Sequence, residues 1–267
     1  MEILIVQYNP NLYGTIPTGL KSLASSNNIR KLALQACNFT GTIPLWLGSE
    51  FSSSLEYLGL GNNQFTGEIP STIGELTQLK VLALDDNDLS ANIEMFHTLP
   101  NIISLLLEDN RITGTLSDAL LSSWTELSFL DLSNNLITGT LPDGLLKHEN
   151  NLRVLDLHGN EITGKLSDTM IPSNNDVLEF VALHENRLTG TIPGSISKLV
   201  TLEHLGSSKK ISPDCRRRAD QPNTDSLIAE FFPICPFDLS PFCTLLRLEY
   251  QWFYWDVTNF LGRNEDT

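Results

Sequence analysis

Residues 159–167, GNEITGKLS, come within one residue of G-x-x-x-x-G-K-[ST], the loop that binds nucleotide phosphates. That loop needs a hydroxyl group directly after its lysine to hold magnesium, and here Leu166 follows Lys165. It also needs a helix after it. Asn160 and Gly164 instead belong to a pattern that recurs at the same spacing elsewhere in the chain. The motif therefore favours a repeated turn over a nucleotide site, and we expect no cofactor.

Two further motifs resemble metal sites but fail at required positions. The run from Asp85 begins like a calcium-binding loop, with Asn87 two residues later, but Ser90 stands where that loop requires glycine and Phe96 where it requires a bidentate acid. The HEN sequence at residues 184–186 lacks the second histidine of a zinc-protease helix. No nucleophile elbow with acid and histidine partners is present. We therefore predict no catalytic residues and no enzymatic activity.

His158 and His184 occupy the same position of two neighbouring repeats, so their rings are expected to lie about one strand spacing, ~4.8 Å, apart. With Asp156 and Glu185 beside them, the two rings could bind a divalent metal or act as a pH-sensitive contact. Surface histidines in tandem repeats more often do neither. We predict no metal site.

All of these residues belong to an internal repeat of the sequence. Its template is L-x-x-L-x-L-x-x-N-x-L-T-G-x-I-P, as in LEYLGLGNNQFTGEIP at residues 55–70 and LSFLDLSNNLITGTLP at residues 127–142. The L-x-L alternation predicts a short strand with one buried and one exposed face. We number the template from its first leucine, so the leucines take positions 1, 4 and 6 and the asparagine takes position 9. The repeats lie near residues 1–28, 29–54, 55–78, 79–101, 102–126, 127–151, 152–177 and 178–201.

Position 9 is asparagine in every repeat but the second, which has cysteine. Because the chain leaves the strand here, the amide is expected to bond to backbone groups that otherwise lack partners, and losing such a buried bond costs ~1–3 kcal/mol. The cysteine is interpreted as a small buried residue rather than a reactive thiol. The glycine after the turn supplies backbone freedom, and the proline stops the segment returning to a strand. This structural ladder consists of Asn9, Cys37, Asn63, Asn87, Asn110, Asn135, Asn160 and Asn186.

The template, with its T-G-x-I-P ending, resembles the plant-type subclass of the leucine-rich repeat. The resemblance covers residues 1–205 and implies an α/β solenoid that is mostly β, with short 3-10 or irregular segments on its convex side. About eight coils would form a curved right-handed superhelix with a concave parallel β-sheet, because one repeat cannot bury its apolar edge alone. The chain is similar to the ectodomains of receptor-like proteins and receptor-like kinases and to secreted inhibitors of pectin-degrading enzymes. Because Met1 begins inside a repeat strand, a fragment of a longer protein is expected.

The variable positions 3, 5, 7 and 8 are expected to face the concave side, where curved repeat arrays usually bind their partners. Aromatic residues should line one edge, with acids in the middle. The net charge of −15 argues against a nucleic-acid ligand and favours a basic partner. The predicted ligand-binding residues are Tyr57, Asp85, Asp86, Glu108, Asp109, Phe129, Asp131, Asp156, His158, Phe180, His184 and Glu185.

Residues 206–267 depart from the repeat. After LEHL at residues 202–205 the expected strand and asparagine turn do not follow, and the next segment is polar, basic and contains proline. Cys235 and Cys243 bracket a segment similar to the cysteine-bracketed caps of plant-type arrays, which would allow a disulfide between them. The predicted cap has two alternatives: a mispredicted end of the chain, and an independent functional segment.

We predict a non-enzymatic recognition module that binds a peptide, protein or glycan through its concave face in an extracellular or cell-surface role. A sequon at Asn38 would carry a glycan if the chain is secreted. No stretch is apolar enough to span a membrane, and no N-terminal targeting segment is visible. The absent signal peptide favours one alternative, a cytoplasmic scaffold for protein–protein interaction. A nucleotide-binding or carbohydrate-active enzyme is the last alternative.

Overall fold

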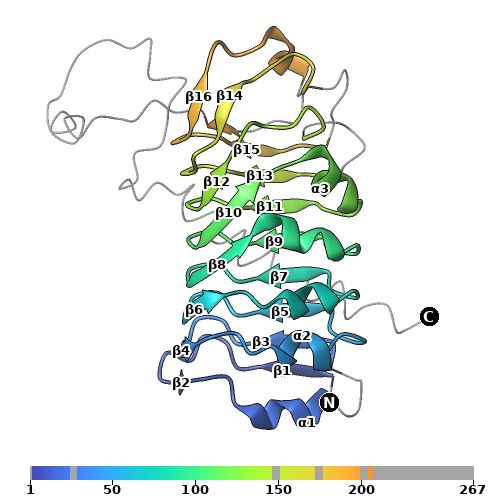
Figure 1. Cartoon of the computed structure of the whole chain (residues 1–267), viewed down its shortest axis with the longest axis vertical. Helices are drawn as coiled ribbons and strands as arrows, with labels where there is room; N and C mark the ends of the chain where they lie inside the picture. Colours follow the sequence, from blue (N-terminus) through green and yellow to red (C-terminus); the bar gives the residue numbers. More distant parts are fainter. Residues whose placement is uncertain (1, 25–28, 146–150, 172–176, 199–203, 207–267) are drawn as a thin grey trace, which may run out of the picture. The chain divides into compact units, whose positions relative to one another are not determined.

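Each repeat adds one short strand to a parallel sheet. The computed structural model describes residues 2–24, 29–145, 151–171 and 177–198, and the backbone of residues 204–206. Nine strands pair in chain order, each beside the strand of the next coil (Figure 1). They are β1 (Ile3–Ile5), β3 (Lys31–Ala33), β5 (Tyr57–Gly59), β7 (Val81–Ala83), β9 (Ser104–Leu106), β11 (Phe129–Asp131), β13 (Val154–Asp156), β15 (Phe180–Ala182) and β17 (His204–Gly206).

The leucines at positions 1, 4 and 6 form the core of each coil. In the third coil Leu55, Leu58 and Leu60 are fully buried, and Leu58 pairs in register with Leu82 of the next coil. Because the same register recurs along the sheet, the buried side chains of one coil pack against those of the next. Burying one such leucine contributes about 1.5–3 kcal/mol. The predicted solenoid with its parallel sheet is confirmed.

The array continues one strand further than the sequence indicated. We expected no strand after Leu205, but β17 pairs in parallel with β15 and aligns Leu205 with Val181. Strand pairing needs only backbone hydrogen bonds, so the sheet extends where the asparagine turn is missing from the sequence. The chain divides into compact units at Met1–Ile211 and Ser212–Thr267, and the second unit lies outside the described residues.

Beyond the asparagine turn, each of the eight coils adds a second short parallel strand, and in six of them the described residues include a helical turn that leads back toward the first sheet (Figure 1). The second set of strands is β2 (Tyr13–Gly14), β4 (Asn38–Gly41), β6 (Gln64–Glu68), β8 (Asp88–Asn92), β10 (Arg111–Thr115) and β12 (Leu136–Thr138), with β14 (Thr163–Lys165) and β16 (Arg187–Thr189) as a separate pair. The helices are α1 (Lys21–Ala24), α2 (Trp46–Glu50) and α3 (Asp118–Ser123). The 3-10 helices are η1 (Thr18–Leu20), η2 (Ser71–Glu75), η3 (Ile93–Thr98) and η4 (Gly194–Lys198).

The position-9 asparagines join neighbouring coils. Asn135 Nδ2 donates to Leu107 O of the preceding coil at 2.9 Å and to two carbonyls of its own turn, Leu132 O and Ser133 O, at 3.2 and 3.0 Å. Its Oδ1 accepts from Ile112 N of the preceding coil at 2.7 Å. One amide therefore satisfies four backbone groups on two coils, and the same arrangement recurs at Asn63, Asn87, Asn110, Asn160 and Asn186.

Cys37 replaces asparagine at a turn where the backbone N–H of the preceding coil already has another acceptor. Leu12 is the counterpart of Ile112, but the residue inserted at Pro10 lets its N–H donate to Asn9 O at 2.9 Å. Cys37 is buried and free, and its Sγ contacts the carbonyls of Val6 and Gln35. The substitution therefore leaves no backbone donor without a partner at this turn.

The glycine of the T-G dipeptide is required for conformation and for space. Gly139 has φ +83°, and a Cβ at this position would lie only 2.8 Å from Thr115 Cγ2 of the preceding coil. Few L-residues adopt such a φ without strain. The threonine before it, Thr138, donates through its hydroxyl to Gly114 O at 3.2 Å. These contacts keep the coils of the second sheet at a fixed spacing.

Candidate functional site

The outer side of the first sheet, called here the concave face, carries the side chains at positions 3, 5 and 7. Position 8 follows as the first residue of the turn, and it has a left-handed backbone in all eight coils. Asparagine, aspartate and glycine tolerate this conformation best, and they fill five of the eight positions. The left-handed residues are Tyr8, Ala36, Asn62, Asp86, Asp109, Asn134, Gly159 and Glu185.

The acids in the middle of this face lie at the ends of β7 and β9. Asp85 is 9% exposed, whereas Asp86 and Asp109 are exposed at the turns that follow. Asn62 Nδ2 donates to Asp86 Oδ2 at 2.8 Å and to Asp85 Oδ2 at 3.4 Å. Within the described part of the chain, Asp85 Oδ1 and Glu108 Oε2 are buried without a hydrogen-bond partner.

Burial and mutual repulsion make these carboxyl groups hard to ionise. Burial, followed by the charge of Asp86, raises the pKa of Asp85 to about 6. Burial also raises the pKa of Glu108 well above its usual value, with Asp131 and Asp85 adding to the effect. The pKa of Asp131 rises to about 7 through burial and the charge of Asp156, against the opposing hydrogen bonds from Ser133. A cation placed here would favour the ionised forms.

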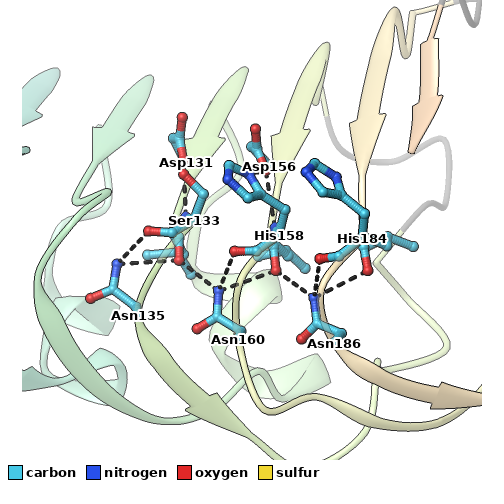
Figure 2. Close-up of polar contacts among 11 residues, drawn as sticks. Asp131, Ser133, Asn135, Asp156, His158, Asn160, His184 and Asn186 are labelled. Carbon is cyan, nitrogen blue, oxygen red and sulfur yellow. Dashed lines mark hydrogen bonds and ion pairs between the residues drawn. The ribbon is translucent and has the colours of Figure 1, made fainter. Parts of the chain in front are cut away.

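The next coils place two carboxylates and two imidazoles on one side of the sheet, while the ladder asparagines point the other way (Figure 2). Asp131 Oδ1 accepts from the hydroxyl of Ser133 at 2.7 Å. Asp156 Oδ1 contacts His158 Nδ1 at 2.7 Å. The rings of His158 and His184 stack with their centroids 4.4 Å apart and an interplanar angle of 3°, so the two rings do lie about one strand spacing apart.

The two histidines have different proton affinities. Burial lowers the pKa of His158, but its hydrogen bond to Asp156 and the nearby acids outweigh this and raise the pKa above its usual value. Burial and the charge of His158 lower the pKa of His184. Among the described residues, no group of three or more His, Cys, Asp or Glu side chains is arranged to hold a metal ion.

Tyr57 corrects the expectation of an exposed aromatic edge, because its side chain is only 1% exposed. Lys31 Nζ lies 4.3 Å from the centroid of its ring, and Gln35 Nε2 approaches its hydroxyl oxygen at 2.5 Å. Burial also lowers the pKa of Lys31 to about 8. Phe129 and Phe180 are half-buried, so they remain accessible on this face.

The burial at Tyr57 has a local cause. Position 5 of its coil is Gly59 and position 7 is Gly61, and the side chains of the neighbouring coils lean over both glycines. A Cβ at Gly59 would meet Gln35, and a Cβ at Gly61 would meet Asp85 Oδ1 at 2.0 Å. The pair of glycines in LGLG was the sequence signal for this packing. It also explains why Lys31 and Gln35 belong to the face although sequence reasoning missed them.

Two further sequence candidates, Lys165 and Asn38, lie apart from this face. Lys165 ends the strand β14, and its side chain packs over Gly190 of the next coil, which is not the context of a phosphate loop. Asn38 is exposed but begins the strand β4 instead of a turn, and its Nδ2 donates to Pro10 O. Cys235 and Cys243 lie outside the described residues.

Comparison with known proteins agrees with this geometry. The family model described as Leucine Rich Repeat matches residues 54–76, 126–147 and 151–171. Receptor-like protein 39 of Arabidopsis thaliana is 32% identical over 124 residues, which cover 45% of this chain and 14% of that protein. The structure of the plant peptide hormone receptor RGFR1 in complex with RGF2 is similar at a TM-score of 0.67 and 29% identity, covering 78% of this chain and 32% of the receptor.

A second similar structure shows that the fold alone does not fix the function. A plant ice-binding protein matches with a TM-score of 0.66 and 25% identity, covering 78% of this chain and 63% of that one. Function must therefore be argued from the residues of the site.

The chain spans only a small part of the receptors that it matches, so their full activities do not transfer to it directly. No helix in the described part of the chain is long and apolar enough to cross a bilayer. The repeat template, the ladder of buried amides and these matches lead to one assignment: the chain contains leucine-rich repeats and is similar to plant receptor-like proteins and to the ectodomains of plant receptor kinases.

Proposed function

We propose that the chain is a non-enzymatic recognition module that binds a peptide or protein segment along its concave face. The observation that carries this proposal is that the side chains that stabilise the array and the side chains that face outward occupy different positions of the repeat. Leucines and position-9 asparagines hold the array together, whereas several charged and aromatic side chains at positions 3, 5, 7 and 8, among them Asp86, Asp109 and Phe129, stay at least partly exposed. Side chains that do not serve the array are the ones available to a partner.

The comparisons support a peptide or protein ligand. The similar receptor RGFR1 is bound to the hormone RGF2, and the similar receptor HAESA is in complex with the peptide hormone IDA and the co-receptor SERK1. An extended peptide laid across parallel strands would meet one row of side chains per coil, at ~4.8 Å per strand. On the same similarity we propose a location at the cell surface or outside the cell. Occupancy of Asn38 by a glycan would support that location.

Peptide selection against the full chain tests this function. We expect displayed peptides enriched on the wild-type protein to lose binding when concave residues are changed, in the variants Phe129→Ala and Asp86→Asn with Asp109→Asn. The matched control changes Glu75, which ends η2, and Glu126, which follows α3, to glutamine. It removes the same number of charges from exposed positions on the helical side. Enriched peptides that bind every concave variant as tightly as the wild type would refute the proposal.

A further inference from the structure

We propose that Asp85 and Glu108 form a site for one arginine side chain of the ligand. This inference rests on the proposed function, because it assigns a role to one part of the concave face. Both residues occupy position 7, two residues beyond the ends of the adjacent strands β7 and β9. The hydrogen bond from Asp86 N to Glu108 O, 3.0 Å long, fixes the ends of these strands side by side. The two carboxyl groups therefore start from backbones about one strand spacing, ~4.8 Å, apart.

Each of these two side chains has a buried oxygen without a partner. Asp85 Oδ1 and Glu108 Oε2 accept no hydrogen bond within the described chain. A buried acceptor without a donor is unfavourable, and more so when it is charged. The arrangement is therefore completed by a partner that supplies several N–H donors at once.

Electrostatics select a cation as that partner. No Lys, Arg or His side chain of the described residues forms an ion pair with Asp85 or Glu108, although such pairs occur elsewhere, as between Arg153 and Glu179 at 2.6 Å. The position-7 residues on either side are Gly61 and Ser133, which are small and uncharged. The neighbouring coils thus neither neutralise the acid pair nor extend bulky side chains from this position.

Arginine fits this pair better than lysine. A guanidinium group presents five donors in a rigid planar fork, so it can bond to two carboxylates at once while keeping its charge at any relevant pH. A lysine ammonium is a compact point charge and is more strongly hydrated. We therefore expect arginine to be preferred over lysine, and lysine over an uncharged side chain of the same shape.

Capped pentapeptides test this preference directly. The probes are acetyl-Gly-Ala-X-Ala-Gly-amide with X as arginine, lysine or citrulline, titrated into the full chain at pH 8 and followed by NMR of backbone amides. We expect the arginine peptide to shift the amides of residues 84–87 and 107–110 and to bind at least about tenfold more tightly than the citrulline peptide. Equal affinity for arginine and citrulline would overturn the proposal.

The double variant Asp85→Asn with Glu108→Gln locates the site. It should reduce the affinity for the arginine peptide by about tenfold or more, whereas Glu75→Gln with Glu126→Gln should leave that affinity unchanged. Removing two buried like charges does not threaten folding, and a far-UV circular dichroism spectrum checks this. A double variant that is folded and still binds arginine as the wild type does would overturn the proposal.

The outcome for this site is separable from the outcome for the whole face. If peptides selected from a library depend on Phe129 but not on Asp85 and Glu108, the concave face binds ligands and the arginine site is wrong. If no concave substitution affects any selected peptide, the proposed function itself is wrong.

Discussion

Replacing Asn135 with alanine tests the physical account of the repeat. The alanine removes four hydrogen bonds and leaves the turn without an amide that bridges two coils. The three carbonyls each keep another donor: Leu107 O retains Asn110 Nδ2, Leu132 O retains Asn160 Nδ2, and Ser133 O retains Asp109 N. None of these contacts offers the N–H of Ile112 another acceptor, so in the alanine variant this N–H is the buried donor left without a partner.

The expected loss follows from that count. An orphaned buried donor costs about 1–3 kcal/mol, and the three weakened carbonyls together add about 1 kcal/mol, so Asn135→Ala should lower the free energy of unfolding by about 2–4 kcal/mol. Asn135→Asp should cost more than alanine at pH 7, because a carboxylate would face the three carbonyls in place of the NH₂ group. Protonation of that carboxylate at low pH should recover part of the difference.

Urea unfolding followed by circular dichroism measures this loss, and hydrogen exchange reports on the amide of Ile112. Asn9→Ala is the matched control, because Asn9 is exposed and bonds only to Val6 and Gln7 carbonyls of its own coil. We expect the control to cost less than about 1 kcal/mol. A cost for Asn135→Ala as small as that of the control, with unchanged exchange at Ile112, would refute the reasoning.

Three further predictions concern glycine, the acid pair and the histidines. Gly139→Ala should destabilise by about 2–4 kcal/mol through its left-handed φ and its clash with Thr115, and Thr115→Ser should recover part of this loss in a double-mutant cycle. A raised acid pKa makes the free energy of unfolding fall as pH rises, so Asp85→Asn with Glu108→Gln should be no more stable than wild type at pH 4 but more stable at pH 8. The shift of the Asp85 pKa from 3.8 to about 6 contributes at most about 3 kcal/mol to this difference. Equal stability differences between variant and wild type at both pH values would contradict this prediction. NMR titration should show His158 holding its proton to higher pH than its stacked neighbour, and the reverse order would exclude the carboxylate contact as the cause.

The repeat made most of the fold predictable, because each structural position is written several times in the sequence. The L-x-L strands, the asparagine turn and the T-G dipeptide recur with the same physical roles, so an error in one repeat is corrected by the others. The left-handed backbone at position 8 was not predicted, although residues there such as Asn62, Asp86 and Gly159 favour it. The strand at residues 204–206 was missed because the template breaks after Leu205, yet Leu205 still occupies position 4 and pairs with Val181 at position 4 of the preceding coil.

The concave face was less predictable, because its side chains interact across coils rather than within one repeat. Position alone predicted that Tyr57 is exposed, yet the neighbouring glycines allow Gln35 and Lys31 to cover it. The tandem spacing predicted the distance between His158 and His184 but not their parallel stacking, which depends on side-chain rotamers. The repeat pattern predicts which residues are neighbours on adjacent strands, but it does not predict their side-chain conformations or the contacts between them.

The acids of this face fall into two classes that should respond differently to a ligand. Asp86 and Asp109 are exposed, so water screens them and each contact with a partner contributes less than a contact with a buried acid. Asp85 and Glu108 are ionised only at an energetic cost in the free protein, because burial and like charges raise the pKa of both groups. A cation bound between them would lower both pKa values, so binding should release protons and become tighter as the pH rises from 5 to 8.

The titratable groups facing the pair are Asp86, Asp109, Asp131 and Tyr57. The first three are acids, and their charges also raise the pKa values of the pair in the free protein. Calorimetry of the arginine peptide in buffers of different ionisation enthalpy would measure this release, and an affinity independent of pH would place the peptide on the exposed acids instead.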